Sequence, residues 1–265
     1  EDRDWKLAFP VRAAEVEGPI ACRMAAAVAP FHPEFLTPMA AVAGAVAEEV
    51  LAALTGPGIT RAYANNGGDI ALWLAPGESL TCALAASSDR VTLYASDAVR
   101  GIATSGWRGR SFSMGIADAV TVLARTAAMA DAAATMVANA VDLDHPGILR
   151  RPAREVQCDS DLGDRLVTVA VPPLTRVDRA RALDAGLRAA DVFRHFIPRL
   201  PLPVGRFDVI EHVLEIEFRH VPAPAGHGLG VELFQRLQAE LPHPRGLVLH
   251  LGNLRDDIGV QAARG

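Results

Sequence analysis

The chain has 265 residues, of which 50% are apolar, and carries a formal net charge of -5 at pH 7. This length is sufficient for one large or two small domains with a sizeable buried core. A mildly acidic chain without a basic stripe argues against a nucleic-acid-binding protein, and the lack of an uncharged apolar run of about 18 residues argues against a membrane span.

The cysteines Cys22, Cys82 and Cys158 are scattered along the chain and show no CxxC spacing. Such a distribution fits neither a disulfide framework nor a zinc site, so we expect a reduced, cytoplasmic setting. The first residue is not methionine and no signal peptide is visible, so we expect a processed or trimmed N-terminus.

The first predicted helix begins at Thr37-Pro38, because a hydroxyl N-cap followed by proline at the first helical position is typical of helix N-termini. The run from Met39 to Leu54 consists almost entirely of Ala, Val and Leu, and a Gly-Pro-Gly sequence ends it. Side chains this small let either a sheet or a ligand approach the helix closely.

Short strand-like runs follow this helix. Asn66-Gly67-Gly68-Asp69 separates the first two runs and favours a tight turn with positive φ angles. Strands are expected at residues 59–65, 70–75, 79–86, 91–94, 101–104, 119–123 and 166–171. A second helix of small residues is expected at 126–141.

The C-terminal part is less distinct. Thr175 with Asp178 resembles a capping box for a helix that reaches about residue 196. Prolines at 198, 201 and 203 mark a boundary, so we expect one domain at 1–197 and a C-terminal strand–helix–strand segment of unknown role at 198–265. That segment is expected to contain strands within 207–221 and at 247–251 and a helix at 231–241.

Asp131 and Thr135 are the first candidates for a functional site. They are four residues apart, so on a helix their oxygens lie on one face, one turn from each other. An aspartate and a hydroxyl on an otherwise small, apolar helix indicate an oxygen-rich site for a hard cation or a phosphate-bearing ligand. A solvated or capping role for Asp131 is the alternative.

These motifs together resemble the UPF0280 branch of the ApbE-related proteins, whose best-known members are FAD:protein FMN transferases. The matching stretches are residues 35–48, 65–70, 102–106, 110–115 and 117–141, and they occur in the same order as in that family. The resemblance implies a mixed α/β (α+β) fold in which helices pack on mostly antiparallel sheets.

In the flavin transferases, the asparagine/diglycine turn lines the dinucleotide site, and paired glycines let backbone N–H groups approach a pyrophosphate closely. The resemblance therefore implies FAD or FMN as cofactor, with ligand contacts from Asn66, Gly67, Gly68 and Asp69.

The same resemblance implies a Mg²⁺ ion. Asp131 and Thr135 inherit the role of magnesium ligands, and a backbone carbonyl near Val42 on the first helix is expected as a third contact.

Further candidate contacts to the cofactor flank these motifs. Arg110 is a natural partner for phosphate because a guanidinium binds such groups bidentately, although plain surface charge is the alternative. The remaining candidates, for which structural roles in loops or at strand ends are the alternative, are Thr37, Thr104, Ser105, Gly106 and Ser111.

One segment departs from the family pattern. The transferases carry a histidine-containing segment before their Val-Thr-Val strand, where this chain reads Arg110-Ser-Phe-Ser-Met-Gly115. In the family reaction, a threonine hydroxyl of a target protein attacks the FAD pyrophosphate while a metal offsets the phosphate charge.

We therefore expect a protein that binds a flavin or other phosphorylated cofactor with a divalent metal and acts as a flavin transferase or a flavin-dependent reductase. The alternatives are a non-catalytic flavin carrier or assembly partner and an interaction scaffold with no ligand. The expected partners are the flavin or small-molecule ligand, an acceptor protein and a second copy of the chain, with neither nucleic acid nor a membrane among them.

Overall fold

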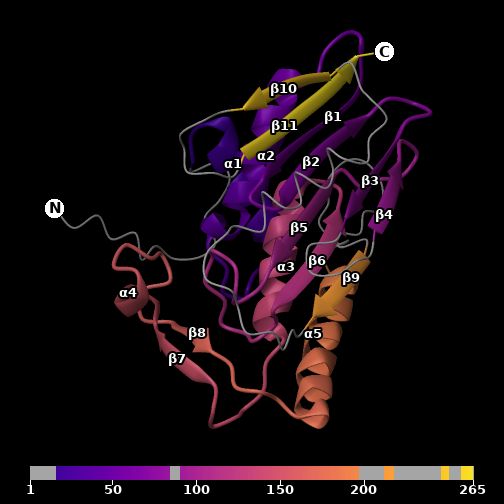
Figure 1. Cartoon of the computed structure of the whole chain (residues 1–265). Coiled ribbons are helices and arrows are strands. Elements are labelled where there is room, and N and C mark those ends of the chain that lie inside the picture. The colour runs from indigo at the N-terminus through magenta and orange to yellow at the C-terminus, as the bar shows by residue number, and fades with distance from the viewer. Residues whose placement is uncertain (1–15, 84–89, 197–211, 218–245, 251–257, 265) are drawn as a thin grey trace, which may run out of the picture.

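The fold is centred on a seven-stranded antiparallel sheet, seen in the computed structural model (Figure 1), which describes residues 16–83, 90–196, 212–217, 246–250 and 258–264. The strand order is β10-β11-β1-β2-β5-β6-β9. In chain order these strands are β1 (Ile59–Asn66), β2 (Asp69–Leu74), β5 (Gly101–Ser105), β6 (Ala119–Ala124), β9 (His212–Glu217), β10 (Gly246–His250) and β11 (Ile258–Arg264).

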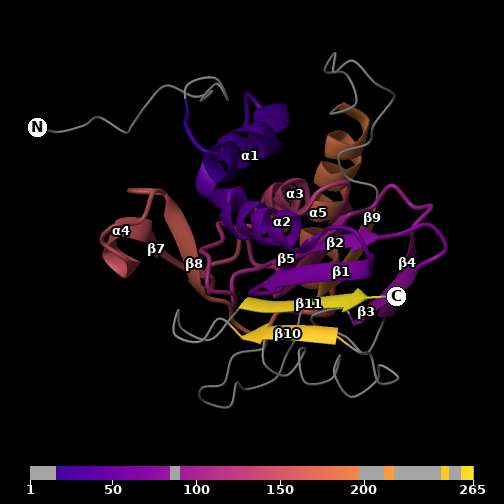
Figure 2. The same cartoon turned by 90° about the horizontal axis from the view of Figure 1, so that it is seen from above.

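Helices cover one face of this sheet, as the view from above shows (Figure 2). They are α1 (Pro19–Val28), α2 (Val42–Leu54), α3 (Ala127–Ala140) and α5 (Arg176–Phe196). The hairpin of β3 (Ser79–Ala83) and β4 (Arg90–Tyr94) packs on the opposite face. This arrangement confirms the expected mixed α/β fold of helices on antiparallel sheets.

The alternation of side chains along the strands divides the core into two sides. On β5, Ile102 joins the cluster under the β3–β4 hairpin, whereas its neighbour Ala103 joins the helix side. On β6, Leu123 and Val122 are divided in the same way. Successive side chains of a strand point to opposite faces, so a strand covered on both faces is largely apolar.

Helix α3 lies unusually close to its neighbours at its N-terminal end. A Cβ added at Gly44 of α2 would lie 2.3 Å from the carbonyl oxygen of Ala127, and one added at Gly101 of β5 would lie 2.3 Å from the amide nitrogen of Ala127. Only glycine permits backbone contacts this short. The small residues of α2 thus allow both α3 and the sheet to pack closely against this helix. On the sheet side, Ala47 of α2 packs with Ala62 of β1.

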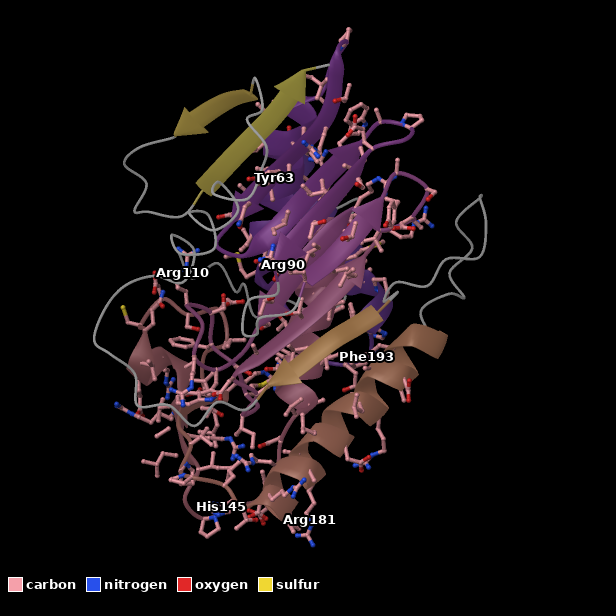
Figure 3. All side chains as sticks on the ribbon, turned by 45° about the vertical axis from the view of Figure 1, so that its right-hand side comes forward. Tyr63, Arg90, Arg110, His145, Arg181 and Phe193 are labelled. Carbon is pink, nitrogen blue, oxygen red and sulfur yellow. The ribbon has the colours of Figure 1, made fainter. Side chains whose placement is uncertain are left out.

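Beyond the sheet, a smaller arm projects beside the helices (Figure 1). It consists of β7 (Leu149–Pro152), α4 (Ala153–Val156) and β8 (Leu166–Ala170), with β7 and β8 paired antiparallel. Within the helical layer, the rings of Phe31 and Phe193 meet edge to face with centroids 5.2 Å apart, which joins α5 to the turn after α1; Figure 3 shows Phe193 on α5.

Most predicted elements in the described part of the chain are found within a few residues of their expected bounds. The N-cap half of the Thr175 capping box is confirmed, because the Thr175 hydroxyl accepts from the amide of Asp178 at 3.1 Å. Thr37 does occupy the N-cap position before Pro38, but the helix that begins there is a 3₁₀ turn at Pro38–Ala41 that precedes α2, and the Thr37 side chain makes no capping hydrogen bond. Helix α1, the strand β7 and the strand β11 were not anticipated.

The C-terminal segment contributes strands to the central sheet. β9 pairs with β6, and β11 inserts between β10 and β1. β9 falls within the strand expected at 207–221, and β10 begins one residue before the strand expected at 247. The helix expected at 231–241 lies outside the described residues, and the division into domains at residue 197 stays a prediction.

Candidate functional site

The candidate site lies at the end of the sheet where the β1–β2 turn meets the start of α2 and the middle of α3. The side-chain amide of Asn66 donates to the carbonyl oxygen of Ala43 at 3.2 Å. On the same helix, the amide of Gly44 donates to a carboxylate oxygen of Asp131 at 3.1 Å. These two bonds bring together the diglycine turn and the aspartate on α3, which the sequence placed in separate motifs.

The turn itself has the geometry that its residues predict. Asn66 pairs with Asp69 across the hairpin, and the two glycines between them have φ angles of 68° and 109°. The amide of Gly68 donates to the side-chain oxygen of Asn65 at 2.9 Å. Glycine suits this turn because it tolerates positive φ angles. Asparagine suits it because its side chain can form a hydrogen bond with the backbone of the turn.

Asp69 and Asp131 form a pair of carboxylates near this turn. Asp69 is buried and accepts from the amide of Thr104 at 3.3 Å. Burial raises its pKa well above the ordinary value, and the negative charge of Asp131 raises that pKa further. Burial also raises the pKa of Asp131 to about 7, against the opposing effect of the amides of Gly44 and Ala43. The two carboxylates therefore repel each other when both are ionised.

A divalent cation would relieve this repulsion. Mg²⁺ prefers oxygen ligands and is usually bound by one or two carboxylates, with water and substrate phosphates completing its coordination. Thr135 is half-buried one turn further along α3 on the face of Asp131, where its hydroxyl is a further oxygen donor. Among the residues that the structure describes, no group of three or more His, Cys, Asp or Glu side chains is placed to hold a metal. A cation here would thus depend on the carboxylate pair, hydroxyl or backbone oxygens and the ligand.

The capping alternative for Asp131 is also present, although between two helices rather than within one. Gly44 is the third residue of α2, so Asp131 satisfies an amide that has no partner within its own helix. In return, a carboxylate oxygen of Glu48 on α2 accepts from the amide of Ala128, the second residue of α3, at 2.7 Å. A carboxylate offers about four acceptor positions, so a capping bond leaves Asp131 able to bind a cation as well.

This reciprocal capping leads to a stability prediction. We expect Glu48→Gln to lower the free energy of unfolding by about 1 kcal/mol, since it weakens a charge-assisted bond at the positive end of α3 and an ion pair with Arg23. Glu49→Gln is the matched control, because Glu49 also pairs with Arg23 but is more exposed. Urea unfolding of the three proteins measures the difference, and equal losses in the two variants would contradict the capping role.

Arg110 lies against the turn. Its Nη2 atom is 2.2 Å from the position that a Cβ on Gly67 would occupy, so the guanidinium rests where glycine leaves space. The positive charge of Arg110 lowers the pKa of Asp69, although burial and Asp131 outweigh this effect. Arg110 therefore lies against the turn, and its charge acts on Asp69.

The loop that carries Arg110 is fixed before and after it. On one side, the indole N–H of Trp107 and the Nε–H of Arg108 donate to the same carboxylate oxygen of Asp118 at 2.9 and 2.7 Å. On the other side, the hydroxyl of Ser113 and the amide of Met114 donate to the side-chain oxygen of Asn139 at 3.1 and 2.9 Å. The loop is thus attached to Asp118, just before β6, on one side of Arg110 and to Asn139 of α3 on the other.

The other predicted cofactor contacts lie on different elements: some on or just after β5, and one against the arm. Thr104 and Ser105 belong to β5 rather than to a loop, and the hydroxyl of Thr104 pairs with that of Thr121 at 2.9 Å. Gly106 follows β5, and Ser111 is exposed in the loop beyond it. Thr37 donates its hydroxyl to Asp161, in the arm between α4 and β8, so its side chain is engaged away from the carboxylate pair.

Sequence reasoning missed the pairing of Asp69 with Asp131. Asp69 was predicted as a cofactor contact, not as a second carboxylate for the metal. The alternation of side chains along β2 could have predicted this pairing. Asp69 lies on the same face of the strand as Ala71, which packs against the helices. The carbonyl expected near Val42 as a metal contact stays a prediction; one residue later, the carbonyl of Ala43 accepts from the side-chain amide of Asn66.

The antiparallel sheet with its helical layer and the ordered motifs around Asp131 together define an ApbE-related α/β protein. A family model described as AbpE bacteria matches residues 3–197. With UPF0280 proteins among its similar sequences, the chain belongs to this UPF0280, ApbE-related family.

Several archaeal UPF0280 proteins show the similarity in detail. The chain is 39% identical over 132 residues to one from Methanothrix thermoacetophila, which covers 48% of the chain and 54% of that relative. It is 37% identical over 167 residues to one from Methanopyrus kandleri (61% and 65%) and 36% identical over 176 residues to one from Methanoregula boonei (62% and 72%). The chain spans about half the length of several of the curated relatives that it matches. In the described part of the chain, no helix has the length and apolarity of a membrane span.

Proposed function

We propose that this protein binds a flavin or another phosphorylated cofactor together with a divalent cation, at the end of the sheet formed by the β1–β2 turn, α2 and α3. The observation that carries the proposal is the closeness of two carboxylates, the buried Asp69 and the half-buried Asp131, to a diglycine turn on which the guanidinium of Arg110 rests. Cation ligands and phosphate ligands thus lie side by side, as binding of a metal–phosphate group requires.

Each residue has a separate part in the proposed site. Asp69 and Asp131 hold the cation, with Thr135 as a further oxygen donor, while the amide of Thr104 positions the carboxylate of Asp69. The open face above Gly68, where an added Cβ would meet nothing within 4 Å, lets a phosphate approach the backbone. A bound divalent cation would offset the charge of the cofactor phosphates.

The chemical outcome distinguishes two candidates. Transfer of a flavin moiety from FAD to a threonine hydroxyl would release AMP, and this is the activity that family resemblance favours. A non-catalytic flavin carrier is the second candidate, favoured by Ser113. This serine lies in the segment where the transferases carry a histidine, and its hydroxyl is buried and bonded to Asn139.

Cofactor binding can be tested by titrating FAD into the protein with Mg²⁺ or with EDTA and following the flavin absorbance and fluorescence. We expect binding to need Mg²⁺, and Asp131→Asn to weaken it by a factor of about 10 to 100. Asp178→Asn is the control, because the carboxylate of Asp178 accepts from the hydroxyl of Thr175 at the start of α5. FAD binding that is independent of Mg²⁺ and equal in both variants would overturn the proposal.

The same samples separate the two candidates. In a reaction with FAD, Mg²⁺ and a threonine-containing acceptor peptide, AMP formation that Asp131→Asn abolishes supports the transferase. Tight FAD binding without AMP formation supports the carrier. The absence of any flavin or nucleotide binding would leave neither candidate standing.

A further inference from the structure

The two adjacent asparagines at the end of β1 make different contacts. The side-chain oxygen of Asn65 accepts from the amide of Gly68 at 2.9 Å, a bond that stays within the β1–β2 turn. The side-chain amide of Asn66 instead donates to the carbonyl oxygen of Ala43 on α2 at 3.2 Å. Successive side chains of a strand point to opposite faces, and Ala64, two residues before Asn66, packs on the helix side. Asn65 therefore shapes the turn, whereas Asn66 attaches it to α2.

The acceptor of this bond belongs to the peptide group that joins Ala43 to Gly44. The N–H of the same group donates to a carboxylate oxygen of Asp131 at 3.1 Å. A peptide group is planar and rigid, so its oxygen and its N–H keep a fixed separation and direction. Hydrogen bonds that follow one another in this way also polarise and strengthen each other. Two hydrogen bonds thus connect the turn, through one peptide group of α2, to the carboxylate on α3.

Close packing holds this peptide group in place. A Cβ added at Gly44 would lie 2.3 Å from the carbonyl oxygen of Ala127 and 2.6 Å from the amide nitrogen of Ala128, both at the start of α3. The turn, by contrast, has open space at Gly68, where an added Cβ would meet nothing within 4 Å. The helix pair is therefore the fixed end of the connection, and the bond from Asn66 sets the position of the turn relative to it.

We propose that Asn66 is a positioning residue: through one peptide group of α2 it holds the β1–β2 turn at a fixed place relative to Asp131, and it thereby couples the binding of a divalent cation to the binding of a phosphate at the turn. This inference rests on the proposed function, which places the cation and the phosphate at these two positions. The attraction between cation and phosphate falls with their separation, so a turn that shifts away from Asp131 loses it.

The coupling can be measured on the full chain by calorimetry, as the affinity for inorganic phosphate with EDTA and with saturating Mg²⁺. The ratio of the two affinities is the coupling factor. In the unsubstituted chain we expect Mg²⁺ to strengthen phosphate binding about tenfold, a typical size for coupled sites. Asn66→Ala is expected to reduce this gain to less than about twofold, because the turn is no longer attached to α2. An undiminished gain in Asn66→Ala would overturn the inference.

Asn65→Ala is the matched control, because it removes the neighbouring side chain and a hydrogen bond of the same turn while it leaves the bond to α2 in place. We expect this variant to weaken phosphate binding similarly with EDTA and with Mg²⁺, so that the coupling factor stays as in the unsubstituted chain. A purely structural role for Asn66 predicts the same behaviour in both variants. Equal coupling factors in Asn65→Ala and Asn66→Ala would therefore contradict the positioning role.

A second substitution guards against misfolding of Asn66→Ala, and urea unfolding checks that each variant is folded. Serine also favours turns, but its hydroxyl is one bond closer to the backbone than the amide nitrogen of asparagine. Asn66→Ser is therefore expected to lose the coupling as Asn66→Ala does. By thermodynamic linkage, phosphate must strengthen Mg²⁺ binding by the same factor as Mg²⁺ strengthens phosphate binding, so the titration with Mg²⁺ repeats the measurement independently. A full coupling factor in folded Asn66→Ser would reject the inference.

Mg²⁺ binding without phosphate separates this inference from the proposed function. Asp131→Asn is expected to lose Mg²⁺ binding, whereas Asn66→Ala is expected to bind Mg²⁺ alone as tightly as the unsubstituted chain. Weaker Mg²⁺ binding in Asn66→Ala would show that Asn66 supports the metal site itself rather than its coupling to phosphate. If phosphate binding to the unsubstituted chain does not respond to Mg²⁺, the proposed function fails together with the inference. If it responds, and Asn66→Ala responds equally, the inference alone fails.

Discussion

Gly44→Ala is expected to lower the free energy of unfolding by about 2–4 kcal/mol, the largest effect of any single methyl group that we predict. Alanine is normally the better helix former, and in an exposed helix interior this change gains about 1 kcal/mol. At Gly44, however, the added Cβ would lie 2.3 Å from the carbonyl oxygen of Ala127 and 2.6 Å from the amide nitrogen of Ala128. Backbone atoms cannot move aside as a flexible side chain can, so α2 and α3 must separate.

The sign of the change is therefore the test. Gly56→Ala is the matched control, because Gly56 follows α2 and an added Cβ there would meet nothing within 4 Å. Thermal and urea unfolding of both variants measure the difference. A gain in stability for Gly44→Ala would show that helix propensity outweighs the contact and that α2 and α3 are not as close as the structure has them.

The same substitution also affects the candidate site. Separation of the helices moves the amide of Gly44 away from the carboxylate of Asp131, which it contacts at 3.1 Å. We expect the variant, where it remains folded, to bind Mg²⁺ more weakly as well. Packing and ligand binding are thus coupled through one backbone position.

Stability without divalent cations is expected to fall as the pH rises from about 4 to above 7. Burial raises the pKa of Asp131 to about 7, whereas an unfolded aspartate titrates near 4. Across this window the folded protein holds a proton that the unfolded chain has lost, so each pH unit costs on the order of 1 kcal/mol per retained proton. The pKa of Asp69 is also raised, which adds to the loss in the same direction.

Mg²⁺ is expected to reverse this loss, because it binds the ionised carboxylates of the folded state and has no comparable site in the unfolded chain. Urea unfolding at a series of pH values, with EDTA or with Mg²⁺, measures both effects. The stabilisation by Mg²⁺ should be larger at pH 8 than at pH 5. Asp131→Asn should flatten the pH dependence and remove most of the Mg²⁺ effect.

Other titrating groups contribute to any pH profile, so the comparison with Asp131→Asn isolates the pair. Asp178→Asn again serves as the control, since Asp178 is bonded to the hydroxyl of Thr175 at the start of α5. A pH profile that is the same in the unsubstituted chain and in Asp131→Asn would show that this carboxylate ionises as it does in water.

Local patterns predicted the elements that their own residues specify. The turn at residues 66–69 follows from paired glycines beside asparagine, and it forms with the positive φ angles expected. The small residues at 127–140 form α3, and Thr126 caps it by accepting from the amide of Met129 at 3.2 Å. In both cases the determining contacts lie within a few residues, so a short window of sequence contains the information.

Thr37 shows how tertiary contacts override a local signal. Its hydroxyl and the following proline have the pattern of a helix N-cap, yet the hydroxyl bonds to Asp161 in the arm. The amides at the start of α2 obtain a partner from Asp131 on another helix instead. A short sequence window cannot distinguish these outcomes, because the competing acceptors come from far along the chain.

The sequence by itself determined the helices and strands around the candidate site, the diglycine turn and the presence of an aspartate and a hydroxyl on one face of α3, since all of these follow from spacing and local conformational preference. The tertiary structure alone decided that Asp69 joins Asp131, that Arg110 rests on Gly67, and that Asp131 and Glu48 cap each other's helices. Those contacts depend on how the sheet and the helices pack, and in particular on the absence of side chains at Gly44 and Gly101, which lets α3 settle against α2 and β5.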